Sequence, residues 1–380
     1  MSAQRPILVL TASTGSGHNM AAEAMAAALR RQNPPAPVEI VDVLNSAGPL
    51  FRRIYGGGYA ALVNRLPWGM GWLYETTDQA NHDVRERLMR AVQNQLTRGI
   101  VRDLLRRAPS LVVNTHYLPA DIVAMLRNDG QLDCPQVTVT TDLETHRIWV
   151  HSPTERYYTA TELGRTFLTT WGVAADRILV TGIPIRPQFE QDVSRADARA
   201  RLNLPPNGLI VLLVVGTVGY GTPEGLLAQL LSVPSDVHVV GIAGRSPKLK
   251  ERFERTVRKS SRSATIVGFS DEMHLWMRAA DLMVTKSGGL TSSEALRCGL
   301  PLAIVNAIPG QETRNADYLL EHGAAIKVNH AQLLGARVAE VLSEPGRLEQ
   351  MRTSAGRLAQ PNAADRIAQD ALSFLTPASI

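Results

Sequence analysis

The stretch from Thr11 to Leu29 combines a short glycine loop with a histidine. Gly15 and Gly17 follow an apolar run and precede an alanine-rich helical pattern, so the loop leads from a strand into a helix. A helix N-terminus presents free N–H groups and the positive end of its dipole, which favour an anion such as a phosphate. The same field lowers the pKa of an imidazole, so we expect His18 to be neutral and able to accept a proton.

This loop fits neither of two common phosphate-loop patterns. A P-loop has Lys-Ser or Lys-Thr after its last glycine, whereas His18 and Asn19 stand there. A dinucleotide fingerprint has a third glycine near Met20, which is absent, although Asp42 imitates its ribose-binding acid. The glycines alone are also compatible with a purely structural tight turn.

A second small-residue turn occurs in the C-terminal half. Its residues are Lys286, Ser287, Gly288 and Gly289. A helix follows in the pattern, so its N-terminus is suited to a diphosphate. Glu294, one turn inside, can accept hydrogen bonds from two ribose hydroxyls, or else pair with Arg297 at i+3. Gln311 and Glu312, at the next strand exit, can reach a hexose or simply begin a helix.

The elements that must position these residues alternate between strand and helix. Short apolar runs at 6–11, 38–43, 110–115 and 136–141 predict buried parallel strands, and a second series follows at 209–216, 237–244, 264–269, 281–288 and 301–307. The fold class is therefore α/β, with two Rossmann-like doubly wound domains and a cleft between them. The predicted boundaries are 1–186 for an acceptor and membrane-binding domain, 187–358 for a donor domain, and 359–380 for a helix packing back across the domains.

Composition limits the function classes. The chain has 380 residues, 44% hydrophobic and 20% charged, and its two cysteines exclude a disulfide framework. No apolar run approaches the roughly 18 residues of a membrane span. Residues 50–107 contain ten arginines and five acids. Because no nucleic-acid signature accompanies this charge, an anionic membrane surface is the expected partner, and a cytoplasmic, peripheral location on the inner face of the cell membrane follows.

Several motifs together resemble one enzyme family. They are "TGSGH", "NTHYLPA", "TTDLETHRIWVH", "GIPIRPQF", "GFSDEM", "KSGGLTSSEALRCGLP" and "IPGQE". The chain resembles the monogalactosyldiacylglycerol synthases and processive diacylglycerol glucosyltransferases, which are inverting, metal-independent GT-B enzymes, and more distantly the lipid II N-acetylglucosaminyl transferase. It departs from the family where Gly15-Ser16-Gly17 replaces three glycines and where Gly288-Gly289 replaces Pro-Gly.

The resemblance implies roles for individual residues. His18 would take the proton of the acceptor hydroxyl, with Asp142 as the competing base or orienter. Phe269 and Met273 would frame the uracil, although both are also compatible with a core position. The implied donor-binding residues are Gly17, Gly216, Thr217, Arg245, Phe269, Met273, Ser287, Gly288, Gly289, Thr291, Glu294, Gln311 and Glu312.

The acceptor and membrane side is predicted from aromatic and basic residues. The implied set is Arg52, Arg53, Tyr55, Trp68, Trp72, His116 and Arg147. Trp68 and Trp72 are spaced i,i+4, so both indoles point the same way, towards a headgroup layer or into a core. His116, His146 and His151 raise the possibility of a metal, but they fall on different loops, so neither a metal nor another cofactor is expected.

The implied function is transfer of a hexose from a UDP-sugar to a diacylglycerol-type lipid with a β-linkage. A UDP-sugar epimerase, a lipid-intermediate GlcNAc transferase and a non-catalytic amphitropic protein that binds lipid or UDP-sugar remain alternatives. The pair Gln311 and Glu312 does not decide between glucose, galactose and N-acetylglucosamine.

Overall fold

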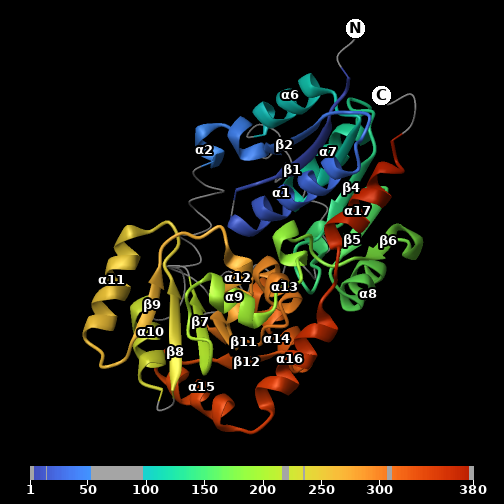
Figure 1. Cartoon of the computed structure of the whole chain (residues 1–380). Coiled ribbons are helices and arrows are strands. Elements are labelled where there is room, and N and C mark those ends of the chain that lie inside the picture. Colours follow the sequence, from blue (N-terminus) through green and yellow to red (C-terminus); the bar gives the residue numbers. More distant parts are fainter. Residues whose placement is uncertain are drawn as a thin grey trace. The chain divides into compact units, whose positions relative to one another are not determined.

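A computed structural model of the chain describes residues 4–13, 15–52, 97–215, 222–233, 236–305 and 310–375. The chain divides into two compact units, Met1–Arg186 with Gln360–Ile380 and Pro187–Ala359. Each unit contains a six-stranded sheet covered by helices (Figure 1). The predicted α/β class with two doubly wound sheets is confirmed.

The sheet of the first unit is parallel throughout, with the strand order β2-β1-β3-β4-β5-β6. Its strands are β1 (Ile7–Thr11), β2 (Val38–Asp42), β3 (Leu111–Asn114), β4 (Gln136–Val139), β5 (Arg156–Thr159) and β6 (Ile178–Val180). The first four lie in the predicted apolar runs, whereas β5 and β6 were not predicted. Ile7 pairs with Val38 on one side and Leu111 on the other, so β1 is an interior strand.

Helices cover both faces of this sheet. They are α1 (Ser16–Arg31), α2 (Pro49–Arg52), α6 (Arg98–Arg107), α7 (Tyr117–Asn128), α8 (Glu162–Thr170) and α17 (Ala363–Leu372). Alternate β1 residues point to opposite faces, so Ile7 and Val9 pack with α1 and α17 while Leu8 and Leu10 pack with α6 and α7. The predicted C-terminal helix thus packs on α1 of the first unit, where Arg31 pairs with Asp365 at 2.6 Å.

The sheet of the second unit is also parallel, with the order β12-β11-β10-β7-β8-β9. Its strands are β7 (Leu209–Val214), β8 (Val237–Ile242), β9 (Ala264–Val267), β10 (Leu282–Thr285), β11 (Leu302–Val305) and β12 (Ala325–Val328). Numbered from β7, this is the strand order of dinucleotide-binding domains. Only β12 falls outside the predicted runs.

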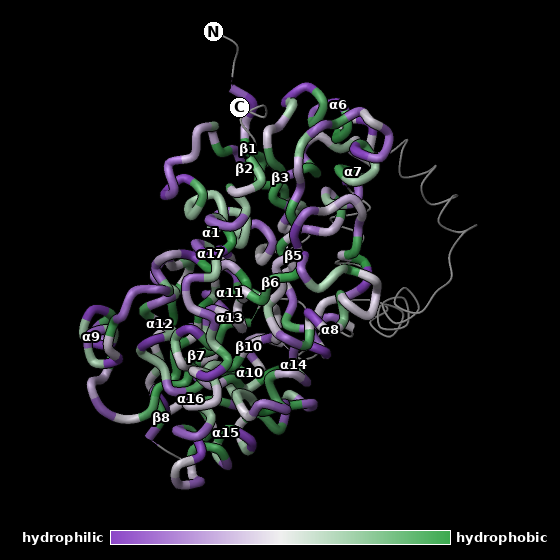
Figure 2. Tube along the Cα trace, turned by 90° about the vertical axis from the view of Figure 1, so that its right-hand side faces the viewer, coloured by the Kyte–Doolittle hydropathy of each residue, from purple (hydrophilic) through white to green (hydrophobic). Residues whose placement is uncertain are grey.

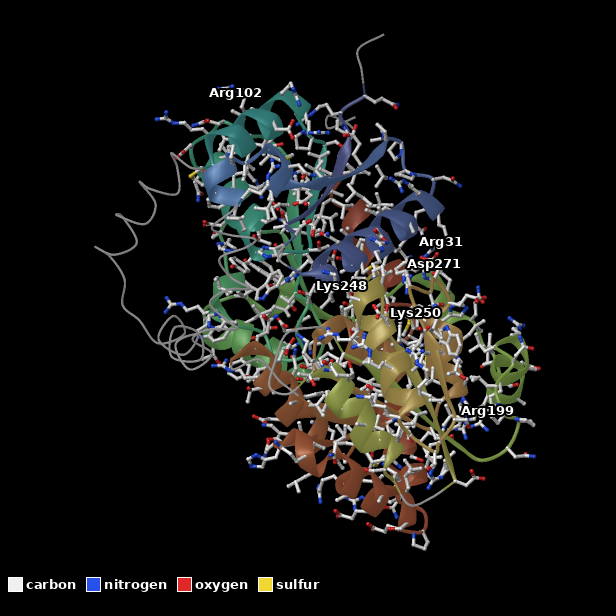
Figure 3. All side chains as sticks on the ribbon, turned by 90° about the vertical axis from the view of Figure 1, so that its left-hand side faces the viewer. Arg31, Arg102, Arg199, Lys248, Lys250 and Asp271 are labelled. Atoms are coloured by element: carbon white, nitrogen blue, oxygen red, sulfur yellow. The ribbon has the colours of Figure 1, made fainter. Side chains whose placement is uncertain are left out.

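The helices of the second unit follow its strands. They are α9 (Arg195–Arg201), α10 (Pro223–Leu231), α11 (Pro247–Arg258), α12 (Met273–Ala279), α13 (Gly289–Arg297), α14 (Gln311–Glu321), α15 (Leu334–Ser343) and α16 (Arg347–Leu358). Thr222 caps α10, because its side chain accepts a hydrogen bond from the N–H of Gly225. Buried Arg199 of α9 pairs with Asp281 at 2.8 Å and fixes this helix to the sheet (Figure 3).

Hydrophobic residues concentrate along the strands inside each unit, and hydrophilic residues lie on the outer turns of helices (Figure 2). Within the described ranges, no helix has both the length and the apolar character needed to cross a bilayer. The strands form the core of each unit, and the candidate functional residues follow the ends of the strands.

Candidate active site

The sheet of the first unit has a switch point between β1 and β3. The chain leaves β1 towards β2 on one side, while β3 lies on the other side. Ligands of open α/β sheets bind at the carboxyl ends of the strands at such a point. His18 lies in the first turn of α1, just after β1, and Thr115 and His116 follow β3 directly. The strand order therefore brings these residues together.

The imidazole of His18 is held through one nitrogen. Its Nδ1 lies 3.0 Å from the carbonyl oxygen of Thr115 and 3.0 Å from Oγ1 of Thr141. A carbonyl oxygen only accepts hydrogen bonds, so Nδ1 carries the proton and Nε2 has the lone pair. Thr115 also donates from Oγ1 to the carbonyl oxygen of His18 at 3.2 Å. No described residue hydrogen-bonds Nε2, which leaves it available to accept a proton.

Packed rings around His18 keep it neutral. The ring of His116 meets it edge-on with centroids 4.5 Å apart, and the ring of Trp149 lies 6.3 Å away. Loss of water lowers the pKa of His18 to about 4, although the hydrogen bond to Thr115 acts in the opposite direction. A pKa of about 4 favours the neutral imidazole that the sequence predicts, and its main cause is burial.

His116 has the opposite tautomer. Its side chain is buried, and Nδ1 accepts a hydrogen bond from the N–H of Leu118 at 3.0 Å, which caps α7. The proton of neutral His116 is consequently on Nε2. Burial, and secondly the nearby His18, lower the pKa of His116 well below its ordinary value. The capping contact was not foreseen from the sequence, and the predicted headgroup contact stays a prediction.

The orienting contact of His18 comes from Thr141, one residue before the predicted acid. Thr141 and Asp142 are both buried in the turn after β4. It is the hydroxyl of Thr141 that lies within hydrogen-bond distance of Nδ1. A threonine has no charge to mark it in a sequence, and only its place at a strand exit beside Asp142 hinted at this role. Asp142 as base or orienter stays a prediction.

The turn between β1 and α1 is tied to a carboxylate. Asp42 accepts hydrogen bonds from the N–H of Ser13 at 3.3 Å, from its Oγ, and from the N–H of Leu44 at 3.1 Å. Asn19 then donates to Oγ of Ser13 at 3.0 Å and accepts from Thr11 at 3.0 Å. Asp42 thus supports the turn that carries His18. Gly17 is the second residue of α1.

Among the remaining acceptor-side predictions, Arg52 and Arg147 lie in the described part of the chain. Exposed Arg52 donates to the carbonyl oxygens of Leu44 at 3.0 Å and Asn45 at 2.7 Å. Exposed Arg147 begins the short helix η3 (Arg147–Trp149). Predicted residues outside the described ranges are Arg53, Tyr55, Trp68 and Trp72.

The three histidines that suggested a metal have separate local contacts. His116 caps α7, His146 caps η3, and His151 lies 3.4 Å from Asp121. Within the ranges that the structure describes, no group of three or more His, Cys, Asp and Glu side chains is arranged as a metal site. Independence from metals stays a prediction.

The second unit has its switch point between β7 and β10. Ser287 and Gly288 follow β10, and Gly289 begins α13, whose first turn has neither an acidic residue nor a side-chain cap. A Cβ built on Gly288 meets no atom within 4 Å. The N-terminus of α13 is therefore open for an anion. Gly216 and Thr217, predicted at the exit of β7, lie outside the described residues.

The first turn of α14 holds the turn after β10. Lys286 Nζ pairs with Glu312 Oε1 at 2.9 Å, and Ser287 Oγ donates to the carbonyl oxygen of Glu312. Asn315 Nδ2 donates to the carbonyl oxygen of Ser287 at 3.0 Å. The predicted residues Gln311 and Glu312 therefore begin the helix that contacts the turn before α13. Lys286 of that turn supplies a cation, which pairs with Glu312. Asn315 was not foreseen.

Two further donor-site predictions lie on α13. Thr291 is half-buried in its first turn, and Glu294 is buried in its second. The alternative pairing of Glu294 with Arg297 is not seen, because Arg297 bonds Glu190 at 2.6 Å. Glu294 is thus one turn behind the open helix end, as the ribose hypothesis requires.

An aromatic side chain stands exposed at the neighbouring strand exits. Phe269, after β9, is 52% exposed, and the guanidinium of Arg245, after β8, lies 4.4 Å from the centre of its ring. The core alternative for Phe269 is therefore wrong. Met273 begins α12 and is half-buried. An exposed ring backed by a cation is suited to stacking a flat base.

Comparisons with known proteins agree with this architecture. The model of the monogalactosyldiacylglycerol (MGDG) synthase family matches residues 18–185, and that of the glycosyltransferase family 28 C-terminal domain matches residues 211–367. Fold, site and these matches define a glycosyltransferase of the two-domain GT-B class. The chain thus has an MGDG synthase domain followed by a glycosyltransferase family 28 C-terminal domain, and it is similar to the processive diacylglycerol glucosyltransferases.

The similarity to curated relatives extends over nearly the whole chain. The processive diacylglycerol beta-glucosyltransferase of Bacillus subtilis (strain 168) is 26% identical over 98% of this chain and 96% of its own. The enzyme of the same name from Bacillus cereus (strain AH187) is 28% identical over 95% and 92%.

Solved structures share the fold. Acinetobacter baumannii MurG has a TM-score of 0.61 at 15% identity, covering 97% of this chain and 99% of its own. Anabaena Alr3699/HepE, solved in complex with UDP and glucose, has a TM-score of 0.56 at 14% identity, covering 98% and 100%.

Proposed function

We propose that this protein is an inverting glycosyltransferase that moves a hexose from a UDP-sugar to the hydroxyl of a diacylglycerol-type lipid. The observation that carries the proposal is the neutral imidazole of His18, held at Nδ1 and available at Nε2, at the switch point of the first unit. Relatives named processive diacylglycerol beta-glucosyltransferase support the choice of donor and acceptor.

In this mechanism Nε2 of His18 takes the proton of the lipid hydroxyl as its oxygen attacks the anomeric carbon. Attack from the face opposite the leaving UDP inverts that carbon and gives a β-glycoside. A base that is neutral at pH 7 is in the correct protonation state, and general base catalysis typically contributes roughly 10²–10⁴-fold.

The leaving diphosphate is stabilised by the second unit. The open N–H groups of α13 and the ammonium of Lys286 supply positive charge at the β10 exit. Glu294 is assigned to the ribose and Phe269 to the uracil. Since this arrangement provides charge without a metal, we propose that transfer proceeds without one.

The test is an assay with separate UDP-glucose and UDP-galactose donors and vesicles containing diacylglycerol. We expect a β-linked glycolipid, identified by mass spectrometry and by NMR of the anomeric proton, in the presence of EDTA. His18→Ala is the matched inactive control. An α-linkage, release of free sugar without glycolipid, or strict Mg²⁺ dependence would contradict the proposal.

The protein is further proposed to work on an anionic membrane surface, at the inner face of the cell membrane. A groove of about 440 Å³ on the first unit runs between α6 and the end of α7. Its lining combines the basic residues Arg98 and Arg102 with the apolar residues Val101, Leu105 and Met125 and with one acid, Asp129. Neither arginine pairs with a described residue, and Arg102 projects outward from α6 (Figure 3). Each such residue contributes about 1 kcal/mol near an anionic surface.

A vesicle co-sedimentation experiment tests this surface. Arg98→Gln with Arg102→Gln should reduce the fraction bound to anionic vesicles several-fold, and added salt should abolish the remainder. Arg106→Gln is the control, because Arg106 lies on the same helix but pairs with Asp103. Equal loss in the control, or no loss in the double variant, would count against this surface.

A further inference from the structure

Thr141 is a buried hydroxyl placed against the proposed base. Its side chain is 5% exposed, in the turn after β4, and Oγ1 lies 3.0 Å from Nδ1 of His18. Strand β4 pairs with β3, which places this turn beside Thr115, whose carbonyl oxygen shares the same Nδ1 proton. Two acceptors from adjacent strand exits therefore hold one N–H group.

This arrangement controls which nitrogen can act. If the ring lost these contacts, it could rotate about χ2 or move its proton to Nε2, and no lone pair would then be presented at that position. The neighbouring His116 has its proton on Nε2, because its Nδ1 accepts from Leu118. The two imidazoles thus meet in opposite tautomers, each fixed by a backbone group.

We propose that Thr141 is a positioning residue that, together with the carbonyl of Thr115, holds His18 in the Nδ1–H tautomer with Nε2 directed to the acceptor hydroxyl. This inference rests on the proposed glycosyltransferase function. It assigns the orienting role, which in many catalytic histidines belongs to a carboxylate, to a neutral hydroxyl. A hydroxyl orients the ring without adding a negative charge that would favour its protonated form.

The chain offers a matched control three residues earlier. Thr138 lies on β4, is fully buried, and its Oγ1 has no hydrogen-bond partner among the described residues. Thr141→Val and Thr138→Val therefore make the same chemical change on the same strand and its exit. Thr141→Ser keeps the hydroxyl and serves as the rescue variant.

The experiment combines enzyme kinetics with ¹⁵N NMR of the full-length protein labelled at histidine. In the parent protein we expect His18 in the Nδ1–H form at pH 7. Thr141→Val should give a mixture of tautomers and reduce kcat roughly tenfold with KM for the donor unchanged, as expected for loss of one orienting hydrogen bond. Thr141→Ser should restore both readouts, and Thr138→Val should change neither.

Two outcomes would overturn the inference: an Nε2–H tautomer of His18 in the parent protein, or a Thr141→Val variant with unchanged tautomer and kcat. Circular dichroism establishes that each variant is folded. If the parent protein forms no glycolipid but shows the Nδ1–H tautomer lost in Thr141→Val, the proposed function fails and the positioning contact stands. The tautomer measurement thus separates the two claims.

Discussion

The two glycine turns of this protein, one in each unit, have the same construction. Gly15 precedes α1 and Gly288 precedes α13, and each turn leaves a strand at the switch point of its sheet. Neither helix has a side-chain cap or an acidic residue in its first turn. A Cβ added to Gly15 or Gly288 would meet no atom within 4 Å. The backbone of either turn therefore has the free N–H groups and the space that a phosphate needs.

Their charged neighbours differ. The first turn is tied through Ser13 to the carboxylate of Asp42, whereas the second has beside it the ammonium of Lys286, which is paired with the carboxylate of Glu312. A negative charge disfavours a phosphate, and a positive one favours it. The same strand-to-helix turn therefore supports a base in one unit and is suited to a diphosphate in the other. Neighbouring charge, and not the glycines, distinguishes the two uses.

The largest effect should come from removing the base. His18→Ala should lower kcat by roughly 10²–10⁴-fold, because general base catalysis contributes about this much. UDP affinity, measured by calorimetry, should stay unchanged because the assigned nucleotide residues belong to the second unit. Retained turnover would show that the first turn has another role, and parallel loss of UDP binding would show that the two turns are not functionally separate.

A bulky residue at each turn tests the comparison directly. Gly288→Val should raise the Kd for UDP roughly 30-fold, about 2 kcal/mol, because the new side chain competes with the phosphates for space. Gly15→Val is the matched control and should leave Kd unchanged. Both backbones are extended, so neither variant should unfold the protein. Equal effects on Kd would remove the distinction between the turns.

We expect removal of the Lys286 charge to weaken UDP binding less than a bulky side chain at Gly288 does. Lys286→Met combined with Glu312→Gln removes both charges of the pair, so no half-buried carboxylate is left without its partner. We expect the Kd for UDP to rise roughly tenfold and its dependence on salt to weaken. Lys327→Met is a suitable control, because Lys327 makes a 3.4 Å pair with Asp317 elsewhere in this unit. An unchanged salt dependence would assign the phosphate attraction to the helix alone.

Much of the fold followed from apolar runs. The runs predicted β1 to β4 and β7 to β11, because strands that are largely buried in a parallel sheet are mostly apolar. Strands β5, β6 and β12 were missed: the sequence of β5, RYYT, contains polar side chains, β6 has only three residues, and β12, AIKV, contains a lysine. Their strand character comes from pairing with neighbouring strands, of β5 with β4 and β6 and of β6 and β12 at the edges of their sheets, which is a property of the tertiary structure.

The site was predictable only where chemistry is local in sequence. His18 and Gly288 could be found because glycines, charge and a helix pattern stand within a few residues of each other. Thr141 could not, since its contact with His18 joins positions 123 residues apart and depends on the order β1-β3-β4. Arg245 over Phe269 was predicted as two separate roles, and their contact depends in the same way on neighbouring strand exits.

A smaller effect is expected from the carboxylate of the first turn. Asp42→Asn keeps the side-chain shape but loses the acceptor for Oγ of Ser13, and a bond of this kind to a charged group contributes about 2 kcal/mol. We expect the free energy of unfolding to fall by about that amount in urea titrations, with kcat reduced two- to threefold. If UDP affinity instead increased, the first turn would be a phosphate site held back by Asp42.

The smallest expected effect is that of pH on kcat, which should stay constant over the neutral range. His18 must be neutral to act, and its pKa of about 4 means that kcat should be constant from pH 8 to about 5.5. A histidine with the ordinary pKa of about 6.5 would lose half of kcat at about pH 6.5 and about nine-tenths of it at about pH 5.5. In the unfolded chain His18 and His116 bind protons below about pH 6.5, so stability falls as the pH drops towards 4. Initial rates at saturating donor should therefore be taken above pH 5, with His116→Asn as the control, because asparagine can still cap α7 but does not titrate. If kcat fell with a midpoint near pH 6.5 in both proteins, His18 would be exposed to water. The first turn would then not hold a buried, neutral base, and this difference from the second turn would be lost.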